Sequence, residues 1–117
     1  VGSSEGGLML RSLIFAAAAL VLVANVVSAQ DKVARGAAVY AEQKCQLCHA
    51  IAGKGNAKGS LDGVGTKLSA ADLKAWIVDA KGMTAKTKST RKPDMKNYPL
   101  PDGDVDALVA YMATLKK

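Results

Sequence analysis

Hydrophobic and polar residues divide the chain into an unbroken apolar stretch and a longer region with helical periodicity. From Leu13 to Ala24 every residue is apolar or small. Beyond residue 30, apolar residues recur at spacings of three and four, which is typical of helices with one buried face. No segment sustains the alternation of apolar and polar residues that a strand needs, so the pattern predicts an all-α fold.

The first predicted helix covers residues 32–45, with Asp31 as its N-cap. Its apolar face consists of Val33, Ala37, Tyr40 and Ala41. Gly36 lies within this helix, although glycine costs about 1 kcal/mol there relative to alanine. We therefore expect Gly36 to let another helix approach closely.

Two further helices are predicted nearer the C-terminus. Ser69 and Asp72 form a capping box that opens a helix ending at Gly82, because glycine is common just past a helix end. The apolar face of this helix consists of Leu73, Trp76, Ile77 and Ala80. The last helix begins near Asp102 or Asp104, and its buried stripe consists of Val105, Leu108, Met112 and Leu115.

Two long loops join these three main helices. Residues 53–65 contain five glycines and no helical period, and residues 83–101 contain all three prolines and many lysines. From residue 30 onward the chain is about ninety residues long, which leaves room for one small core. The region is also short of aromatic residues, so we expect it to need an additional staple to fold.

The first 29 residues are predicted to be upstream residues and a secretory signal peptide, and residues 30–117 the folded domain. Met9-Leu10-Arg11 provides a short positive region, the apolar stretch follows, and Val27-Ser28-Ala29 matches a small-x-small cleavage site. The apolar stretch is about twelve residues long, short of the roughly twenty needed to span a bilayer. Export to the periplasm is expected. A retained membrane anchor is the alternative, because two valines beyond Asn25 lengthen the apolar segment.

The chain is basic, with 16 Lys and Arg against 10 Asp and Glu and a formal net charge of +6. The positive charge is densest between Lys81 and Lys96. Such a surface favours acidic protein partners or anionic lipid. Nucleic acid is not expected as a partner, because no recognition helix or aromatic stacking platform accompanies the charge. We expect a monomer.

The strongest chemical signal is Cys45-Gln46-Leu47-Cys48-His49, which includes both cysteines and the single histidine. C-x-x-C-H is the attachment signature of a covalently bound c-type haem. Residues three apart lie on one face of a helical turn, so the two thiols can bond to neighbouring corners of one porphyrin. His49 follows directly and supplies an imidazole to the iron.

Other cysteine chemistries fit this run less well. A zinc site lacks ligands, because the sequence has no further Cys or His to complete four. A thioredoxin-type dithiol belongs beside a strand–helix–strand pattern, which is not predicted here. A structural disulfide leaves the adjacent histidine unexplained. One haem c, joined to Cys45 and Cys48, is therefore the predicted cofactor and the predicted staple of the small core.

The second axial ligand of the iron has several candidates: Met83, Met95, Met112, a lysine, or none. Met112 falls on the buried stripe of the last helix and is better explained as core. Met95 lies in a proline-flanked segment, whose backbone is restricted, just before the last helix. Met95 is favoured, with Met83, a lysine and an open site as alternatives. Trp76, the largest apolar side chain of the domain, is expected to bind against the haem.

Over residues 31–117 these features resemble a class I c-type cytochrome. The residues that carry the resemblance are Gly36, Tyr40, the C-x-x-C-H run, Leu61-Asp62-Gly63-Val64-Gly65, Trp76, Met95, Tyr98 and Asp106-Ala107-Leu108-Val109-Ala110-Tyr111. The resemblance implies a small cytochrome-c-like fold, in which three helices and glycine-rich loops surround one haem. It also implies that Gly36 and Tyr40 meet Leu108 and Tyr111, and that His49 and Met95 are the axial ligands.

The chain departs from the family pattern at two places. Many members carry Gly-Pro in the loop that orients the proximal histidine, where this chain has Gly59-Ser60. The sequence therefore does not identify which carbonyl accepts the His49 N–H. Family members often have Met-Pro, whereas Lys96 follows Met95.

The function that these features imply is one-electron transfer between respiratory or other redox partners, by a carrier rather than an enzyme. A thioether opposite an imidazole raises the reduction potential and leaves no vacant position for a substrate. Acidic docking surfaces of membrane oxidases or reductases are the expected partners. Two alternatives remain: a membrane-tethered haem subunit of a larger oxidoreductase complex, and an open-site haem enzyme or gas-binding protein.

Overall fold

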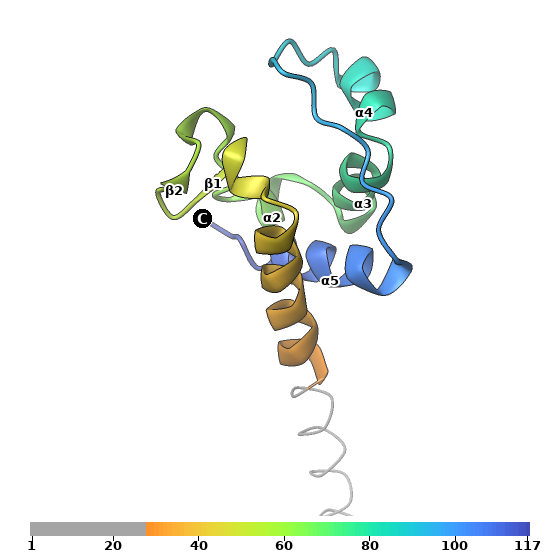
Figure 1. Cartoon of the computed structure of the whole chain (residues 1–117). Coiled ribbons are helices and arrows are strands. Elements are labelled where there is room, and N and C mark those ends of the chain that lie inside the picture. The colour runs from red at the N-terminus through yellow and green to blue at the C-terminus, as the bar shows by residue number, and fades with distance from the viewer. Residues whose placement is uncertain (1–27) are drawn as a thin grey trace, which may run out of the picture. The chain divides into compact units, whose positions relative to one another are not determined.

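The computed structural model describes residues 28–117, of which residues 32–117 form one compact unit (Figure 1). The expected leader, residues 1–29, lies outside the described residues except for its last two. Residues 28–42 are helical. The later elements are β1 (Ala50–Ile51), β2 (Lys54–Gly55), α2 (Val64–Lys67), α3 (Ala70–Val78), α4 (Ala80–Thr87) and α5 (Asp102–Ala113), with 3-10 turns at Cys45–Leu47 and Ala57–Gly59. The prediction of a helical fold is confirmed, with the addition of one small antiparallel hairpin, β1–β2.

The N-terminal helix (28–42) and α5 cross at close range (Figure 1). Position 36 requires glycine, because a Cβ there would collide with the carbonyl oxygen of Ala107 and lie 2.6 Å from the Cβ of Tyr111. The rings of Tyr40 and Tyr111 meet edge to face, with their centroids 6.1 Å apart. The expected close approach of Gly36 and Tyr40 to the last helix is thus present, and Tyr111 is one of the residues they meet.

The N-terminal helix differs in detail from the prediction. It is already helical at residue 28, so Asp31 does not cap it, and it ends at residue 42 rather than at Cys45. Val39 is fully buried, whereas Ala41 is exposed. The apolar face therefore turns toward Gly36 and Val39, where α5 approaches. Within residues 28–117, no helix combines the length and apolarity that a membrane crossing requires.

The core gathers the buried faces of the N-terminal helix, α3 and α5. Its buried members are Val39, Leu73, Ile77, Val105, Leu108 and Met112. Ser69 caps α3 as expected, because its Oγ accepts a hydrogen bond from the Asp72 N–H at 3.1 Å. Each buried side chain contributes about 1.5–3 kcal/mol. Six of them make a thin core against the conformational entropy of ordering a domain of this length.

The helix that begins at Ser69 ends earlier than expected. It stops at Val78, and Asp79 then caps a new helix, α4, by accepting a hydrogen bond from the Gly82 N–H at 3.1 Å. Gly82 therefore lies in the first turn of α4 and is not a C-cap. The first part of the loop expected over residues 83–101 is helical because an Asp N-cap follows α3 directly.

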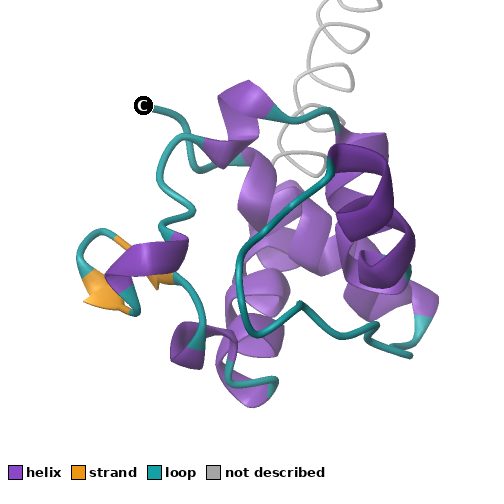
Figure 2. Ribbon diagram, turned by 90° about the horizontal axis from the view of Figure 1, so that it is seen from above, coloured by secondary structure: helices purple, strands orange, loops and turns teal. Residues whose placement is uncertain are grey.

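Residues 88–101 join α4 to α5 and form a long loop (Figure 2). Two hydrogen bonds pin its second half to the helices before it. The N–H of Tyr98 donates to the carbonyl of Ile77 at 2.9 Å, and the Oδ1 of Asn97 accepts from the N–H of Lys81 at 3.1 Å. The loop is irregular, yet its path past α3 and α4 is defined.

Candidate functional site

A cavity of about 530 Å³ opens beside the Cys45–His49 segment. Its volume falls within the range of about 300–1,000 Å³ that cofactor and ligand sites occupy. Its apolar wall is built from α2, α3, α5 and their flanking residues: Leu61, Val64, Leu68, Leu73, Trp76, Ile77, Leu108 and Met112. Because Leu73, Ile77, Leu108 and Met112 also belong to the core, the cavity and the core share one wall.

Both cysteines line the cavity, and both thiols are free. The 3-10 turn over Cys45–Leu47 brings them together, because the N–H groups of Cys48 and His49 both donate to the Cys45 carbonyl, at 3.1 and 2.9 Å. Burial raises the pKa of the Cys45 thiol, so this thiol is neutral at neutral pH. The turn thus presents two thiols and one imidazole to the same cavity.

His49 has one ring nitrogen committed to the protein and one that is not. Its Nδ1 lies 2.9 Å from the carbonyl oxygen of Gly59. A carbonyl can only accept, so Nδ1 carries the proton and Nε2 keeps its lone pair for a metal. Burial lowers the pKa of His49, which favours this neutral form. Gly59 is thus the carbonyl that the sequence left open, and the Gly59-Ser60 variant of the loop retains the orienting bond.

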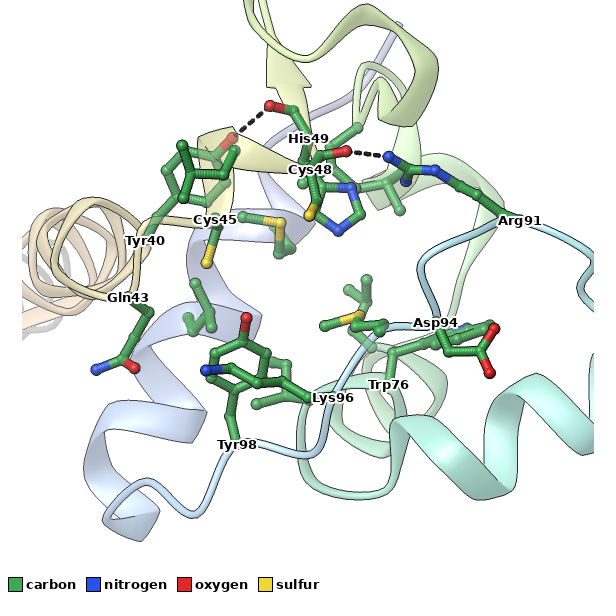
Figure 3. A pocket seen from close by; sticks show the side chains of 18 of the residues that line it. Tyr40, Gln43, Cys45, Cys48, His49, Trp76, Arg91, Asp94, Lys96 and Tyr98 are labelled. Carbon is green, nitrogen blue, oxygen red and sulfur yellow. Dashed lines mark hydrogen bonds between the residues drawn. The ribbon is translucent and has the colours of Figure 1, made fainter.

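The three candidate methionines occupy different places. Met95 is half-buried and lines the cavity, as does Met112, which is 6 % exposed on α5. Met83 is buried in α4 and does not line the cavity. In Figure 3 the chain neighbours of Met95, Asp94 and Lys96, lie across the cavity from the cysteines and the histidine.

Trp76 lines the cavity from α3 and is half-buried, on the same side as Lys96 and Tyr98 (Figure 3). The predicted site residues Cys45, Cys48, His49, Met95 and Trp76 therefore all meet at one cavity. Residues 28–117 contain no cluster of three or more His, Cys, Asp or Glu side chains that would hold a bare metal ion.

Three polar or charged residues of the cavity had no specific role in the site predicted from the sequence. The Lys96 ammonium lies 5.0 Å from the centre of the Tyr98 ring, a cation–π contact at the cavity edge. Burial raises the pKa of Tyr98, so this phenol stays neutral. Arg91 also lines the cavity and donates to the Cys48 carbonyl. The sequence does not distinguish Arg91 from the lysines around it as a site residue, because its contact is with a residue 43 positions away.

The residues around the cavity fit a covalently attached haem. A flat apolar macrocycle needs an apolar wall, two thiols at one edge and a neutral imidazole with a free nitrogen, and all three are present. The cavity is also lined by Arg91, Thr84 and Ser89, polar residues of the kind that a macrocycle with acidic substituents needs.

Comparison with protein families agrees with this chemistry. The Cytochrome c family model matches residues 33–116. The chain belongs to the cytochrome c family. Members of this family carry covalent haem c and in general transfer electrons, so Cys45 and Cys48 are its attachment pair and the resemblance seen in the sequence is confirmed. No curated protein and no solved structure matches the chain significantly.

Proposed function

We propose that this cytochrome c is a one-electron carrier whose iron is held between His49 and Met95. The observation that carries the proposal is that His49, both attachment thiols and Met95 line one cavity. When bound, the haem supplies a one-electron couple, because its iron exists as ferric and ferrous forms. A reduced donor protein delivers the electron and an oxidised acceptor protein removes it. No bond of the polypeptide forms or breaks.

The chain's own residues set the properties of the carrier. His49 is oriented by its hydrogen bond to Gly59, which fixes the tautomer and raises the basicity of Nε2. Leu68, Leu73 and Ile77 exclude water from the cavity wall, and a dry site strengthens every electrostatic interaction within it. With Met95 as the second ligand the coordination sphere is closed, which favours a carrier over an enzyme, because an enzyme needs an open position.

Met95 is favoured over the other methionines as the second ligand by its location. It lies between Asp94 and Lys96, which stand across the cavity from His49 in Figure 3, and that loop is fixed by the hydrogen bonds of Asn97 and Tyr98. Met83 faces the interior instead. Met112 belongs to the same helix stripe as Leu108 and packs in the core.

The test compares matched leucine variants of the haem-loaded protein. The wild-type ferric form should show the weak red absorbance band of thioether-ligated haem, and its ferrous form should bind carbon monoxide slowly. Met95→Leu should lose the band and bind carbon monoxide rapidly, because a side chain of similar volume removes only the sulfur. Met83→Leu and Met112→Leu should keep both properties. A band that survives in Met95→Leu, or rapid carbon monoxide binding by the wild type, contradicts the proposal.

We also propose acidic docking surfaces on membrane redox complexes as the partners. Lys44 and Lys96 line the cavity and are exposed, and Leu47, beside the attachment cysteines, is 68 % exposed. An apolar spot bordered by lysines suits a transient complex that is steered by charge and released quickly. Electron transfer to an acidic partner should slow as ionic strength rises, and a rate that ignores salt contradicts the steering.

A compartment for this carrier is proposed on the family and on the leader pattern. Cytochrome c domains are typically periplasmic or extracellular, and the leader pattern in residues 9–29 supports export. We therefore propose a periplasmic carrier, either released or tethered by its leader. N-terminal sequencing of the protein purified from its native source distinguishes the two, because a mature chain that begins at Gln30 has no tether.

A further inference from the structure

Arg91 lies in the loop over residues 88–101, and its side chain reaches across to the haem-attachment segment, Cys45–His49, in Figure 3. Its guanidinium donates to the carbonyl oxygen of Cys48, the residue directly before the proximal histidine. Arg91 also stands four positions before Met95 in the chain. The contact therefore links the segment that carries one proposed ligand to the loop that carries the other.

Gly59 completes the same cluster. A Cβ at this position would collide with the Cys48 carbonyl and with the Arg91 guanidinium, so the missing side chain makes room for both. The carbonyl of Gly59 accepts the Nδ1 proton of His49. Arg91 thus contacts the two backbone segments that orient the imidazole, one through a hydrogen bond and one through packing.

The polypeptide itself provides no carboxylate partner for Arg91. Within residues 28–117, no Asp or Glu forms an ion pair with it, whereas Arg35 pairs with two carboxylates and Lys92 with one. Its guanidinium bonds the residue directly before His49, so its positive charge stands close to the proposed iron ligand. A positive charge near the iron favours the form that carries one positive charge less.

We propose that Arg91 is a positioning residue that clamps the Met95 loop to the proximal histidine segment and, through its charge, stabilises the reduced protein. This inference rests on the proposed function. Arginine suits the role because its planar fork keeps a full charge at every physiological pH while it bonds a carbonyl. Arg91 performs this role within the protein itself and does not need to contact a redox partner.

The test measures the equilibrium of the haem-loaded protein with a redox mediator of known potential. Arg91→Gln should shift this equilibrium toward the oxidised form by about threefold to tenfold, where tenfold corresponds to 59 mV for one electron. Arg91→Lys keeps the charge and should recover at least half of the shift. Lys86→Gln, which removes an equal charge from an exposed residue outside the cavity, should change the equilibrium by much less. Equal shifts in Arg91→Gln and Lys86→Gln overturn the proposal.

A second readout tests positioning separately from charge. The ring protons of His49 give strongly shifted magnetic resonance signals in the ferric state, and these depend on ring orientation. Arg91→Lys should move them, because an ammonium does not reproduce the guanidinium fork at the Cys48 carbonyl, and Lys86→Arg should leave them in place. If the His49 signals do not move in Arg91→Lys, the positioning role of Arg91 is contradicted. This result holds even if the Arg91→Gln protein cannot be obtained with its haem. A failure of the proposed function looks different, since the wild type itself would then lack the red band.

Discussion

The two sides of this small domain are held together in different ways. Where the N-terminal helix crosses α5, backbone and side chains fit so closely that no atom can be added at Gly36. On the other side, between the Cys45–His49 segment and the loop before α5, the protein surrounds about 530 Å³ of cavity and shares its core wall with that space. At the helix crossing two parts of the polypeptide fit each other, whereas on the cavity side the polypeptide fits a haem.

This difference separates stability from function. The crossing needs only small and apolar residues at the right spacing, and its contacts are made within the polypeptide. The cavity side depends on a group that the chain must acquire, and its polar residues serve that group. A change at the crossing should therefore alter stability and leave the haem chemistry intact, and a change at the cavity side should do the reverse unless it removes the haem itself.

Removal of the haem should have the largest effect. In a Cys45→Ala, Cys48→Ala variant the cavity loses its covalent occupant, and at about 24 cal/mol per Å³ a cavity of 530 Å³ would cost at most about 13 kcal/mol. Even part of that cost exceeds the net stability of the fold, which is the free energy that remains when the entropy of folding is subtracted from the burial of six side chains. The far-ultraviolet dichroism should show loss of most helix. A variant with full native helix would mean that the crossing alone holds the fold.

Crowding the helix crossing should have the next largest effect. Gly36→Ala pushes a methyl group against the backbone of α5, and overpacking costs about 3 kcal/mol against about 1 kcal/mol gained from helix propensity. We expect a net loss of about 2 kcal/mol in denaturant unfolding of the haem-loaded protein, with the red absorbance band unchanged.

Gly103→Ala is the matched control for this substitution. It lies on α5, where no atom stands within 4 Å of an added Cβ, and it should gain about 0.5–1 kcal/mol. If Gly36→Ala and Gly103→Ala behave alike, the close approach of the two helices is not what position 36 provides.

The smallest predicted effect concerns an ion pair at the edge of the crossing. Arg35 holds Asp104 through two hydrogen bonds of 2.9 and 3.0 Å, and this bonding lowers the pKa of Asp104. A depressed pKa stabilises the fold above the ordinary aspartate pKa, and this contribution disappears as pH falls through the depressed value. Asp104→Asn should therefore unfold slightly more easily than the wild type at neutral pH, and the two should converge in strong acid.

Salt and a second ion pair provide the controls. Both groups of the Arg35–Asp104 pair are solvent-accessible, so the difference at neutral pH should shrink at high ionic strength. Asp106→Asn removes a looser surface contact, 4.0 Å from Lys74, and should be indistinguishable from the wild type. A difference for Asp104→Asn that persists in strong acid would assign the effect to packing rather than to charge.

Much of the site was predictable because its chemistry is local in the chain. The spacing of Cys45, Cys48 and His49 specifies a covalent haem within five residues, and the apolar stripe of α5 follows from a helical period. Such patterns depend only on neighbours along the backbone. The sequence pattern did not predict helix α4, because Gly82 resembles the glycine that follows a helix end. In the structure, Asp79 caps α4 and Gly82 lies in its first turn.

What the sequence by itself determined is the haem attachment, the imidazole and the helical class, since each is written in adjacent residues. Only the tertiary structure decided which carbonyl orients His49, that Met83 lies outside its cavity, and that Arg91 reaches Cys48. The two hydrogen bonds join residues 10 and 43 positions apart. They depend on how the loops close around one space, and no spacing of residue types along a single chain encodes that closure.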